Sequence, residues 1–220
     1  MGQAAAEIAE RVESLRQQEM ARLVSQAELR ALQSQINPHF LFNALNTLYG
    51  VIPREVAGAR RMVLNLADIF RYFLQTDKTF VPLEKEMEIV RAYLEVEQLR
   101  LGSRLKIEID LDDAALDVQV PVLSLQPLVE NAIKHGVAQR VEAGYVRVQG
   151  KLRGEELQLI VENSGGETSA AARGTGVGLQ NVRRRLEICY GPAATIRLTP
   201  DPQKTTVEIC LPIAVVSRAQ

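Results

Sequence analysis

The sequence predicts an α+β fold in which an N-terminal helical region is followed by an α/β sandwich, and two observations predict it. Up to Gly102 the chain is rich in Ala, Glu, Gln, Arg and Leu, and its apolar residues recur with a helical period. Beyond Gly102 apolar and polar residues alternate, as on half-buried strands, and two strand connections are hairpins. Strands mixed with helices favour a mixed sheet under helices.

Composition argues against several classes of protein. The 220 residues are 46% apolar and 24% charged, as in an ordinary soluble globular protein. Lys and Arg total 26 against 27 Asp and Glu, and this net charge of -1 argues against a nucleic-acid partner. No apolar run approaches the ~20 residues that cross a bilayer, and we expect no secretory signal. Cys189 and Cys210 lack metal-ligand spacing with the histidines, which indicates free thiols in a reducing, cytosolic setting.

The first 28 residues are predicted to form a coiled-coil helix. Glycine is absent from Ala4 to residue 49, and the single proline of that stretch is Pro38. The apolar residues Ile8, Val12 and Leu15 have 4-3 spacing and are followed by a phase slip, as in a coiled-coil seam with a stutter. So narrow a stripe requires a partner helix. The alternative is a frayed leader.

Two more helices are expected before residue 102. A break at residues 51–53 separates the first helix from a second one with apolar residues at helical spacing, and the two are predicted to pair as an antiparallel hairpin. Residues 79–83 are interpreted as a linker. A Glu-rich helix then runs from Leu83 to Leu101 and ends at Gly102.

The second half of the chain begins with an alternating strand at residues 105–111. The elements expected after it are a helix at 121–134, strands at 145–149 and 157–161, a Gly-rich loop at 165–178, a helix at 179–190, and a closing hairpin of strands 195–199 and 206–211.

The protein has two histidines, and the first lies in a polar cluster at residues 35–46. Pro38 inside a helix costs about 3 kcal/mol, because it removes a backbone donor and clashes with the preceding turn. A kink there would expose the imidazole of His39, and Asn43 at i+4 would orient it from the same face. A neutral imidazole nitrogen is a nucleophile toward phosphorus. We therefore predict His39 as a phospho-acceptor with Asn43 as its catalytic neighbour; the alternative is a capping or core histidine beside a proline kink.

The second histidine belongs to a polar cluster at residues 125–136. On a helix, apolar residues such as Leu128 would face the sheet, and the polar residues on the opposite side are Asn131, Lys134 and His135. Asn131 offers a neutral oxygen to Mg²⁺, and Lys134 offers a point charge to phosphate. The pattern predicts a polyphosphate site with Mg²⁺ at Asn131; the alternative is the solvated end of a helix.

A third pattern, Gly174-Thr175-Gly176-Val177-Gly178-Leu179, runs into a helix. Alternate glycines let the backbone approach an anion closely, and the helix N-terminus adds unpaired N–H groups and a favourable dipole. The pattern does not follow a strand in a βαβ unit, and P-loop spacing is missing, so neither nucleotide fingerprint applies.

The order of these motifs resembles the catalytic core of sensor histidine kinases of the LytS/YehU type. A histidine helix is followed by an Asn helix, a strand that ends at Asn163-Ser164-Gly165-Gly166, and a glycine lid. Residues 35–46 match the family's phospho-acceptor box, residues 125–136 its N box and residues 174–181 its second glycine box. The resemblance extends from about residue 29 to residue 212 and includes Arg71-Tyr72 and the run at 93–100.

The resemblance implies a protein-histidine kinase of a two-component system. Residues 1–28 would be a signalling coiled-coil helix, residues 29–101 a phospho-acceptor and dimerisation region, and residues 102–220 a catalytic domain of the Bergerat-type ATP-binding fold. With ATP and Mg²⁺ the homodimer would phosphorylate His39 and pass the phosphoryl group to an aspartate of a response regulator. No sensing module is seen in the 220 residues, so we expect the cytoplasmic portion of an inner-membrane sensor, tied to the membrane only through a missing N-terminal region.

The resemblance also implies a role for each candidate nucleotide-binding residue. Asn131 would hold Mg²⁺ against the phosphates, and Asn163 with Gly165 would lie at adenine. Lys134 and His135 would line the phosphate or ribose side. Gly174, Gly176 and Gly178 would form the lid, and Leu179 after it would also belong to the nucleotide-binding residues.

Some positions depart from the pattern of the wider superfamily. Asn163 stands where an Asp opens the DxGxG motif, and the last Gly of that motif is Glu167. Phe40 stands where many such kinases place an acid, and Pro127 stands where hydrolysing relatives carry a catalytic Glu, which disfavours an ATPase. The amide of Asn163 offers both a donor and an acceptor, so use of GTP is expected beside ATP; the alternative is that neighbouring hydrogen bonds lock the amide in one orientation. The altered motif leaves one alternative function, an ATP-binding regulatory scaffold with weak or no kinase activity.

Overall fold

The computed structural model describes residues 38–75, 78–165 and 177–213, of which 38–40, 73–75 and 177 are described by their backbone alone. The chain forms two compact units that divide between Val51 and Ile52, and each is described by itself. The first unit contributes the helix α2 (Pro38–Val51). The predicted coiled coil at 1–28 lies outside the described residues, and the antiparallel pairing of α2 with the next helix stays a prediction.

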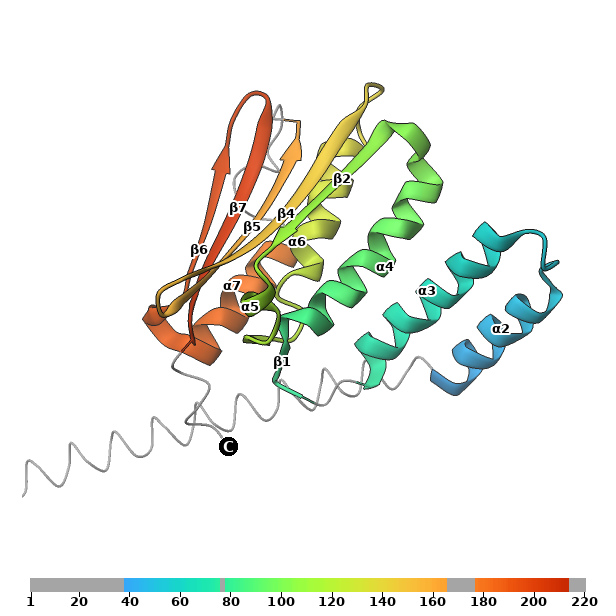
Figure 1. Ribbon diagram of the computed structural model, residues 1–220, viewed down its shortest axis with the longest axis horizontal. Helices are drawn as coiled ribbons and strands as arrows, with labels where there is room; N and C mark the ends of the chain where they lie inside the picture. The colour runs from blue at the N-terminus through green and yellow to red at the C-terminus, as the bar shows by residue number, and fades with distance from the viewer. Residues whose placement is uncertain (1–37, 76–77, 166–176, 214–220) are drawn as a thin grey trace, which may run out of the picture. The chain divides into compact units, whose positions relative to one another are not determined.

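The second unit is built on a mixed five-stranded sheet, as the sequence predicts (Figure 1). Its strands lie in the order β2-β4-β5-β7-β6; β2 and β4 pair in parallel, and the other neighbours pair antiparallel. These strands are β2 (Leu105–Leu111), β4 (Gly144–Arg153), β5 (Glu156–Ser164), β6 (Thr195–Pro200) and β7 (Lys204–Pro212).

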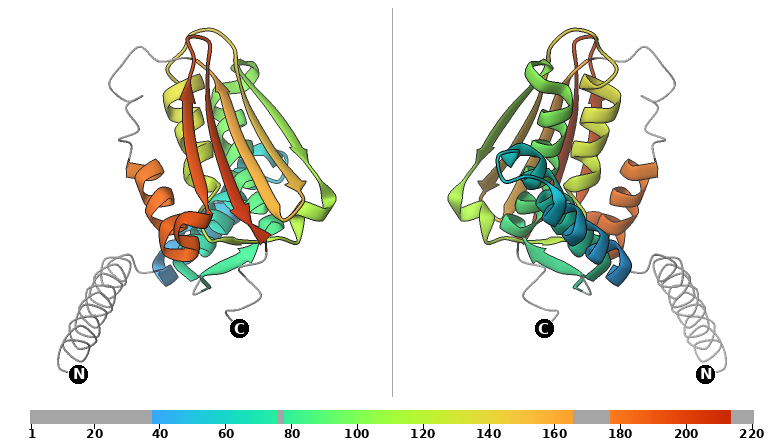
Figure 2. Two further views of the ribbon diagram at one scale, coloured as in Figure 1. Left: turned by 90° about the vertical axis from the view of Figure 1, so that its left-hand side faces the viewer. Right: turned by 90° about the vertical axis from the view of Figure 1, so that its right-hand side faces the viewer.

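Helices of the second unit cover one face of this sheet, and among the described residues of that unit the other face carries none (Figures 1 and 2). The covering helices are α4 (Leu83–Leu101), α6 (Gln126–Asn131) with its π-helical continuation η2 (Ala132–Val137), and α7 (Val177–Tyr190). Shorter helical segments are α5 (Asp113–Leu116), η1 (Gly102–Arg104) and η4 (Gly191–Ala193). No helix in the described part of the chain has the length and apolar character needed to cross a membrane.

The strand pleat decides which face is covered. Along β4, Val146 and Val148 are buried, whereas Arg147 and Gln149 point to the other side and are partly exposed. The buried side forms one apolar cluster with the helices, to which α4 contributes Leu83, Met87, Val90 and Leu94, α6 contributes Leu128 and Val129, and α7 contributes Leu179, Val182 and Leu186. Helix α4 therefore shares its core with the sheet, although it precedes residue 102.

The helix α3 (Ala57–Gln75) packs on α4 through a second, smaller cluster. Its buried members are Ile69, Tyr72 and Ile89. A polar contact adds to this packing, because the Asn65 side-chain amide donates to Glu95 Oε2 at 2.9 Å. The helix predicted after the break at residues 51–53 is therefore confirmed, and within the second unit its partner is α4.

The segment interpreted as a linker, residues 79–83, contains a strand. β1 (Phe80–Pro82) pairs antiparallel with β3 (Gln119–Pro121) in a separate two-stranded sheet. Both strands have three residues, which is too short for an alternating pattern, and their partners lie far apart in the chain. The linker interpretation is therefore wrong for these residues.

The helix expected from residue 121 begins only at Gln126. Leu123 has a φ of 59°, in the left-handed region that a non-glycine residue rarely adopts and that a continuous helix does not contain. The Ser124 hydroxyl donates to the Pro121 carbonyl at 2.5 Å, which closes a turn before the helix. Residues 122–125 therefore form a loop that leads from β3 into α6.

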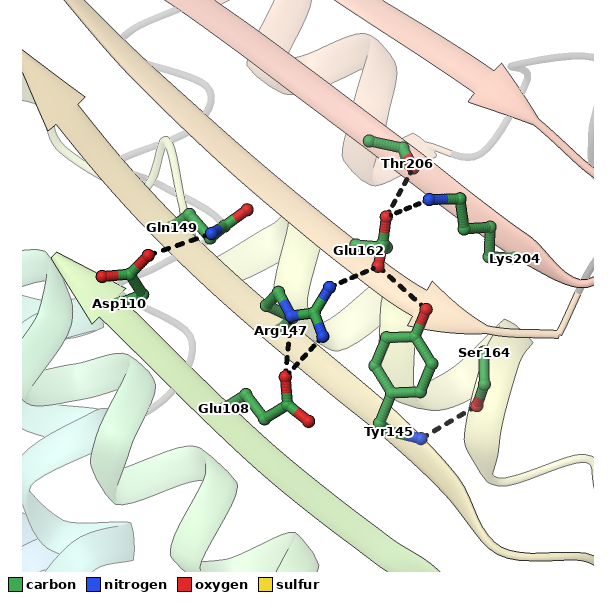
Figure 3. Close-up of polar contacts among 9 residues, drawn as sticks. All are labelled: Glu108, Asp110, Tyr145, Arg147, Gln149, Glu162, Ser164, Lys204 and Thr206. Atoms are coloured by element: carbon green, nitrogen blue, oxygen red, sulfur yellow. Dashed lines mark hydrogen bonds and ion pairs between the residues drawn. The ribbon is translucent and has the colours of Figure 1, made fainter.

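The buried carboxylate of Glu162 organises the outer face of the sheet (Figure 3). Its oxygens accept hydrogen bonds from Lys204 Nζ at 2.7 Å, the Tyr145 hydroxyl at 2.8 Å, Arg147 Nη1 at 3.1 Å and Thr206 Oγ1 at 3.4 Å. Burial alone would raise the pKa of Glu162, but the hydrogen bonds and charges of Lys204 and Arg147, with the Tyr145 hydroxyl, outweigh it and lower that pKa. One carboxylate thus ties β4, β5 and β7 together.

We expect Glu162→Gln to lower the free energy of unfolding by about 1–3 kcal/mol at neutral pH, because its donors lose a charged partner. Since the folded-state pKa of Glu162 lies below the ordinary value of 4.5, its contribution is complete above that pH and is lost as the pH falls further. Urea unfolding at neutral pH and at about pH 3 measures the free energy of unfolding of both proteins. The difference between wild type and Glu162→Gln should be smaller at the acidic pH.

The matched control is Glu108→Gln, which removes the other carboxylate that Arg147 contacts, at 2.7 Å. The Glu108 side chain is 49% exposed, so its loss should cost less than about 1 kcal/mol. The role given to Glu162 would be contradicted if both substitutions lowered the free energy of unfolding equally. It would also be contradicted if the difference between wild type and Glu162→Gln grew in acid.

Candidate functional site

Residues 126–137 form one continuous helical segment, α6 followed by the π-helical η2. Leu128 and Ile133 are buried on the sheet side. On the opposite side Lys134 and His135 are exposed, and Asn131 is half-buried. The predicted division of this segment into an apolar and a polar side is confirmed. A π-helical turn is uncommon and often marks a functional site.

Asn131 lies beside the start of α7. A Cβ atom on Gly178 would lie 2.9 Å from Asn131 Nδ2 and 3.6 Å from Pro127 Cβ, so any side chain at position 178 would displace the Asn131 amide. The next residue, Leu179, has its side chain in the core and can meet a ligand only through its backbone. The N-terminus of α7, where N–H groups lack helical partners, therefore lies next to Asn131.

Asn163 lies near the end of β5 and is 6% exposed. Its Nδ2 donates to the carbonyls of Ser164 at 3.1 Å and Gly165 at 3.5 Å. Both partners accept hydrogen bonds, so a flipped amide would set oxygen against oxygen, and Oδ1 is the atom left to accept from a ligand. The expectation that Asn163 offers either side of its amide is therefore wrong.

Gly136 makes this arrangement possible. A Cβ atom on Gly136 would lie 2.2 Å from Asn163 Nδ2 and 3.0 Å from the Ser164 carbonyl oxygen. The helical segment and the end of β5 therefore meet without a side chain between them. No role is predicted for Gly136 from the sequence; the available signal is that the polar cluster at 125–136 ends in a glycine, which has no side chain to block a close contact.

The structure brings the candidates together in two groups, Asn131 with Gly178 and Asn163 with Gly165. The groups meet the same helical segment, the first at Asn131 and the second at Gly136. These two positions are five residues apart, about one turn of the π-helix, so one elongated ligand can contact both groups. The exposed Lys134 and His135 lie on the stretch between them, and Gly174 and Gly176 lie outside the described residues.

His39 and Asn43 belong to α2, in the first unit. The backbone is helical from Pro38 onward, so His39 and Asn43 have the i, i+4 spacing that the prediction requires. Asn43 is exposed, and its carbonyl accepts from the Thr47 hydroxyl at 2.9 Å. The orientation of the imidazole and the kink expected at Pro38 stay predictions.

No group of three or more His, Cys, Asp or Glu that could hold a metal ion occurs in residues 38–75, 78–165 and 177–213. Mg²⁺ does not require such a group, because it commonly binds through one or two side chains together with the phosphates of a substrate. Asn131, half-buried beside a helix N-terminus, fits that mode of binding.

Two family models match this chain. Residues 27–105 match the histidine kinase model, and residues 116–215 match the model of histidine kinase-, DNA gyrase B- and HSP90-like ATPases. His39 and Asn43 fall within the first match, and the candidate nucleotide residues fall within the second.

Solved structures share the fold. The histidine kinase domain of the blue-light activated histidine kinase from Erythrobacter litoralis matches with a TM-score of 0.51 and 17% identity, over 80% of this chain and 96% of that one. The catalytic domain of histidine kinase ThkA matches with a TM-score of 0.51 and 18% identity, over 65% of this chain and all of that one. These likenesses confirm the predicted fold class.

Curated relatives are more similar in sequence. Sensor histidine kinase BtsS of Escherichia coli is 38% identical over 184 residues, which cover 84% of this chain and 33% of the relative. Sensor histidine kinase/phosphatase LytS of Staphylococcus aureus is 35% identical over 206 residues, which cover 87% of this chain and 35% of that relative. The chain thus spans about a third of the length of these relatives. With both family matches and these relatives, the chain belongs to the sensor histidine kinases of the LytS type.

Proposed function

We propose that this chain is the kinase core of a two-component system, which phosphorylates His39 from ATP and passes the phosphoryl group to an aspartate of a response regulator. The observation that carries the proposal is that Asn131 lies on one helical segment and Asn163 of β5 lies against the same segment at Gly136, in residues that match an ATPase family. A histidine on a separate helix, in residues that match the histidine kinase family, supplies the acceptor.

The adenine end of the nucleotide is assigned to Asn163 and Gly165. Asn163 Oδ1 accepts a hydrogen bond from the exocyclic amino group of adenine, whereas guanine would present a carbonyl oxygen at that place. The amide cannot turn to suit guanine, because Ser164 and Gly165 hold its Nδ2. Gly136 provides the space in which this amide lies.

The phosphate end is assigned to Asn131 and the N-terminus of α7. Mg²⁺ held at Asn131 would neutralise charge on the phosphates, and the first N–H groups of α7 at Gly178 and Leu179 attract anions. Lys134 and His135 line the phosphate or ribose side, and Gly174 and Gly176 belong to the lid. Phosphoryl transfer depends mainly on such positioning and charge neutralisation.

His39 supplies the nucleophile. Its imidazole nitrogen forms a bond to the γ-phosphorus while the bond from that phosphorus to the leaving oxygen of ADP breaks. Asn43 orients the imidazole from one turn away.

The assembly completes the proposal. We propose a homodimer formed through residues 29–101, in the cytoplasm, with the membrane reached only through an N-terminal region. A regulatory ATP-binding scaffold would keep the nucleotide site but leave His39 without a use, and no contact in the described residues favours it.

We expect His39→Gln to abolish stable phosphorylation of the protein and to leave ATP binding intact, because glutamine is polar and of similar size but lacks a nucleophilic ring nitrogen. Incubation with γ-labelled ATP, followed by acid and alkali treatment, measures acid-labile, alkali-stable label. His135→Gln is the control and should keep the label, although its nucleotide affinity falls. Label that persists on His39→Gln would refute the assignment.

We expect Asn131→Ala to lose the thermal stabilisation that Mg-ATP gives the wild-type protein, while the melting temperature without nucleotide stays within a few degrees. The lost group faces a ligand and not the core, so the fold should survive. Asn65→Ala, which removes an amide that contacts Glu95 outside the site, should keep the full shift. An unchanged Mg-ATP shift in Asn131→Ala would contradict the role.

We expect the wild-type protein to bind Mg-ATP at least about tenfold more tightly than Mg-GTP, since an unmatched polar group at the base costs roughly 1.4 kcal/mol or more. Asn163→Asp should not sharpen this ratio, because the new oxygen faces the carbonyls of Ser164 and Gly165 and weakens both complexes. Isothermal titration of both nucleotides against both proteins gives the four affinities. Equal affinities in the wild type, or no change in the variant, would remove Asn163 from the base.

A further inference from the structure

The carboxylate of Glu86, on α4, is completely buried at 0% exposure, yet three donors surround it. The backbone N–H groups of Leu123 and Leu125 donate to it at 2.6 Å and 3.0 Å, and the Tyr72 hydroxyl of α3 donates to the same oxygen as Leu123. Burying a carboxylate is costly unless its oxygens are hydrogen-bonded, so these three bonds hold Glu86 in place.

The loop that Glu86 contacts, residues 122–125, leads directly into the helix of the candidate site. The carbonyl of Leu125 accepts from the N–H groups of Leu128 at 3.1 Å and Val129 at 3.2 Å, which are the first hydrogen bonds of α6. Leu123 keeps a left-handed φ of 59°, a conformation that persists only where its surroundings fix it. Glu86 therefore fixes the backbone from which α6, and with it Asn131, begins.

Two other helices also contact this loop, α7 by a hydrogen bond to Val122 and α3 through the apolar cluster that contains Tyr72. Arg185 of α7 donates to the carbonyl of Val122, and α7 begins beside Asn131 at Gly178. On α3, burial and the adjacent Glu86 charge raise the pKa of Tyr72, so its hydroxyl stays protonated as a donor. α3 is the next helix in the chain after α2, which carries His39.

We propose that Glu86 is a positioning residue of the nucleotide site, whose carboxylate sets the loop at residues 122–125 and so the placement of Asn131. Through the Tyr72 hydroxyl the same carboxylate links α3 to nucleotide binding. This inference rests on the proposed binding of Mg-ATP at Asn131. None of these residues touches the nucleotide in the proposal; they act through the backbone that carries Asn131.

The first test is Glu86→Gln in the full chain. Glutamine keeps the shape of glutamate, but its amide nitrogen must face one of the three donors. We expect the Kd for Mg-ATP to rise about tenfold or more, equivalent to about 1.4 kcal/mol. Without nucleotide, deuterium exchange of the Leu123 and Leu125 amides should quicken while the amides of β4 and β5 keep their protection.

The matched control is Glu95→Gln, the same change on the same helix. Glu95 also accepts a bond from α3, from Asn65 at 2.9 Å, but its side chain is 47% exposed. The Kd for Mg-ATP should change less than about twofold, as for an exposed pair.

The outcomes separate this inference from the proposed function. A folded Glu86→Gln protein with wild-type affinity and wild-type exchange at Leu123 and Leu125 overturns the inference. If the wild-type protein binds no Mg-ATP, the proposed function fails, and exchange at these two amides without nucleotide still decides whether Glu86 positions the loop.

Tyr72→Phe tests the same junction if Glu86→Gln does not fold. It removes one hydroxyl and leaves both backbone bonds to Glu86. In the wild type, Mg-ATP should slow exchange at Leu123, at Leu125 and in α3 around Tyr72, since coupling between two sites is reciprocal. In Tyr72→Phe the slowing in α3 should be lost and that in the loop kept. Equal slowing of α3 in both proteins overturns the inference.

Discussion

The apolar face of β4 and β5 has to be buried, and the segments that bury it are the ones that carry the candidate site. Helix α6 and η2 place Leu128 and Ile133 on that face, so the opposite side, with Asn131, is held toward solvent. Leu179 anchors the start of α7 in the same core, which sets Gly178 against Asn131. Apolar packing therefore sets which side of each segment is buried and which side is left for the polar groups.

Contacts on both faces of the sheet fix the end of β5. Glu162 and Asn163 are consecutive, so their side chains point to opposite faces of the sheet. On the outer face Glu162 is tied to Tyr145, Arg147 and Lys204 (Figure 3). On the helix face Asn163 fills the space that Gly136 leaves open. The outer bonds thus fix the strand end on which the inner amide depends.

Local patterns sufficed to predict most of the fold and the polar side of the candidate site. The strands of the large sheet alternate with period 2, and the helical segment at Asn131 has a clear apolar side, so each could be located from neighbouring residues alone. The pairing of β1 with β3 left no such signal, because each strand has three residues and its partner is distant in the chain. Leu123 has a left-handed φ, so α6 begins several residues later than predicted, and a leucine gives no sign of such a conformation.

The remaining site features depend on contacts between distant segments. Glu86 is one of several glutamates on α4, and nothing in their spacing distinguishes the one that is buried under the loop at residues 122–125. The amide orientation of Asn163 follows from two backbone carbonyls, which residue identity does not reveal. The role of Gly136 appears only when the helical segment and β5 are brought together.

The parallel pairing of β2 with β4 has a consequence for how the site assembles. Parallel neighbours need a long crossover, and the crossover here, from Leu111 to Gly144, contains α5, β3, α6 and η2. Asn131 therefore lies inside a crossover whose two ends meet only when the edge strand β2 pairs with β4, and such non-local pairing slows folding. A nucleotide that binds only when β2 is paired with β4 stabilises that pairing. Release of the nucleotide therefore lowers the free energy needed to detach β2 from the sheet.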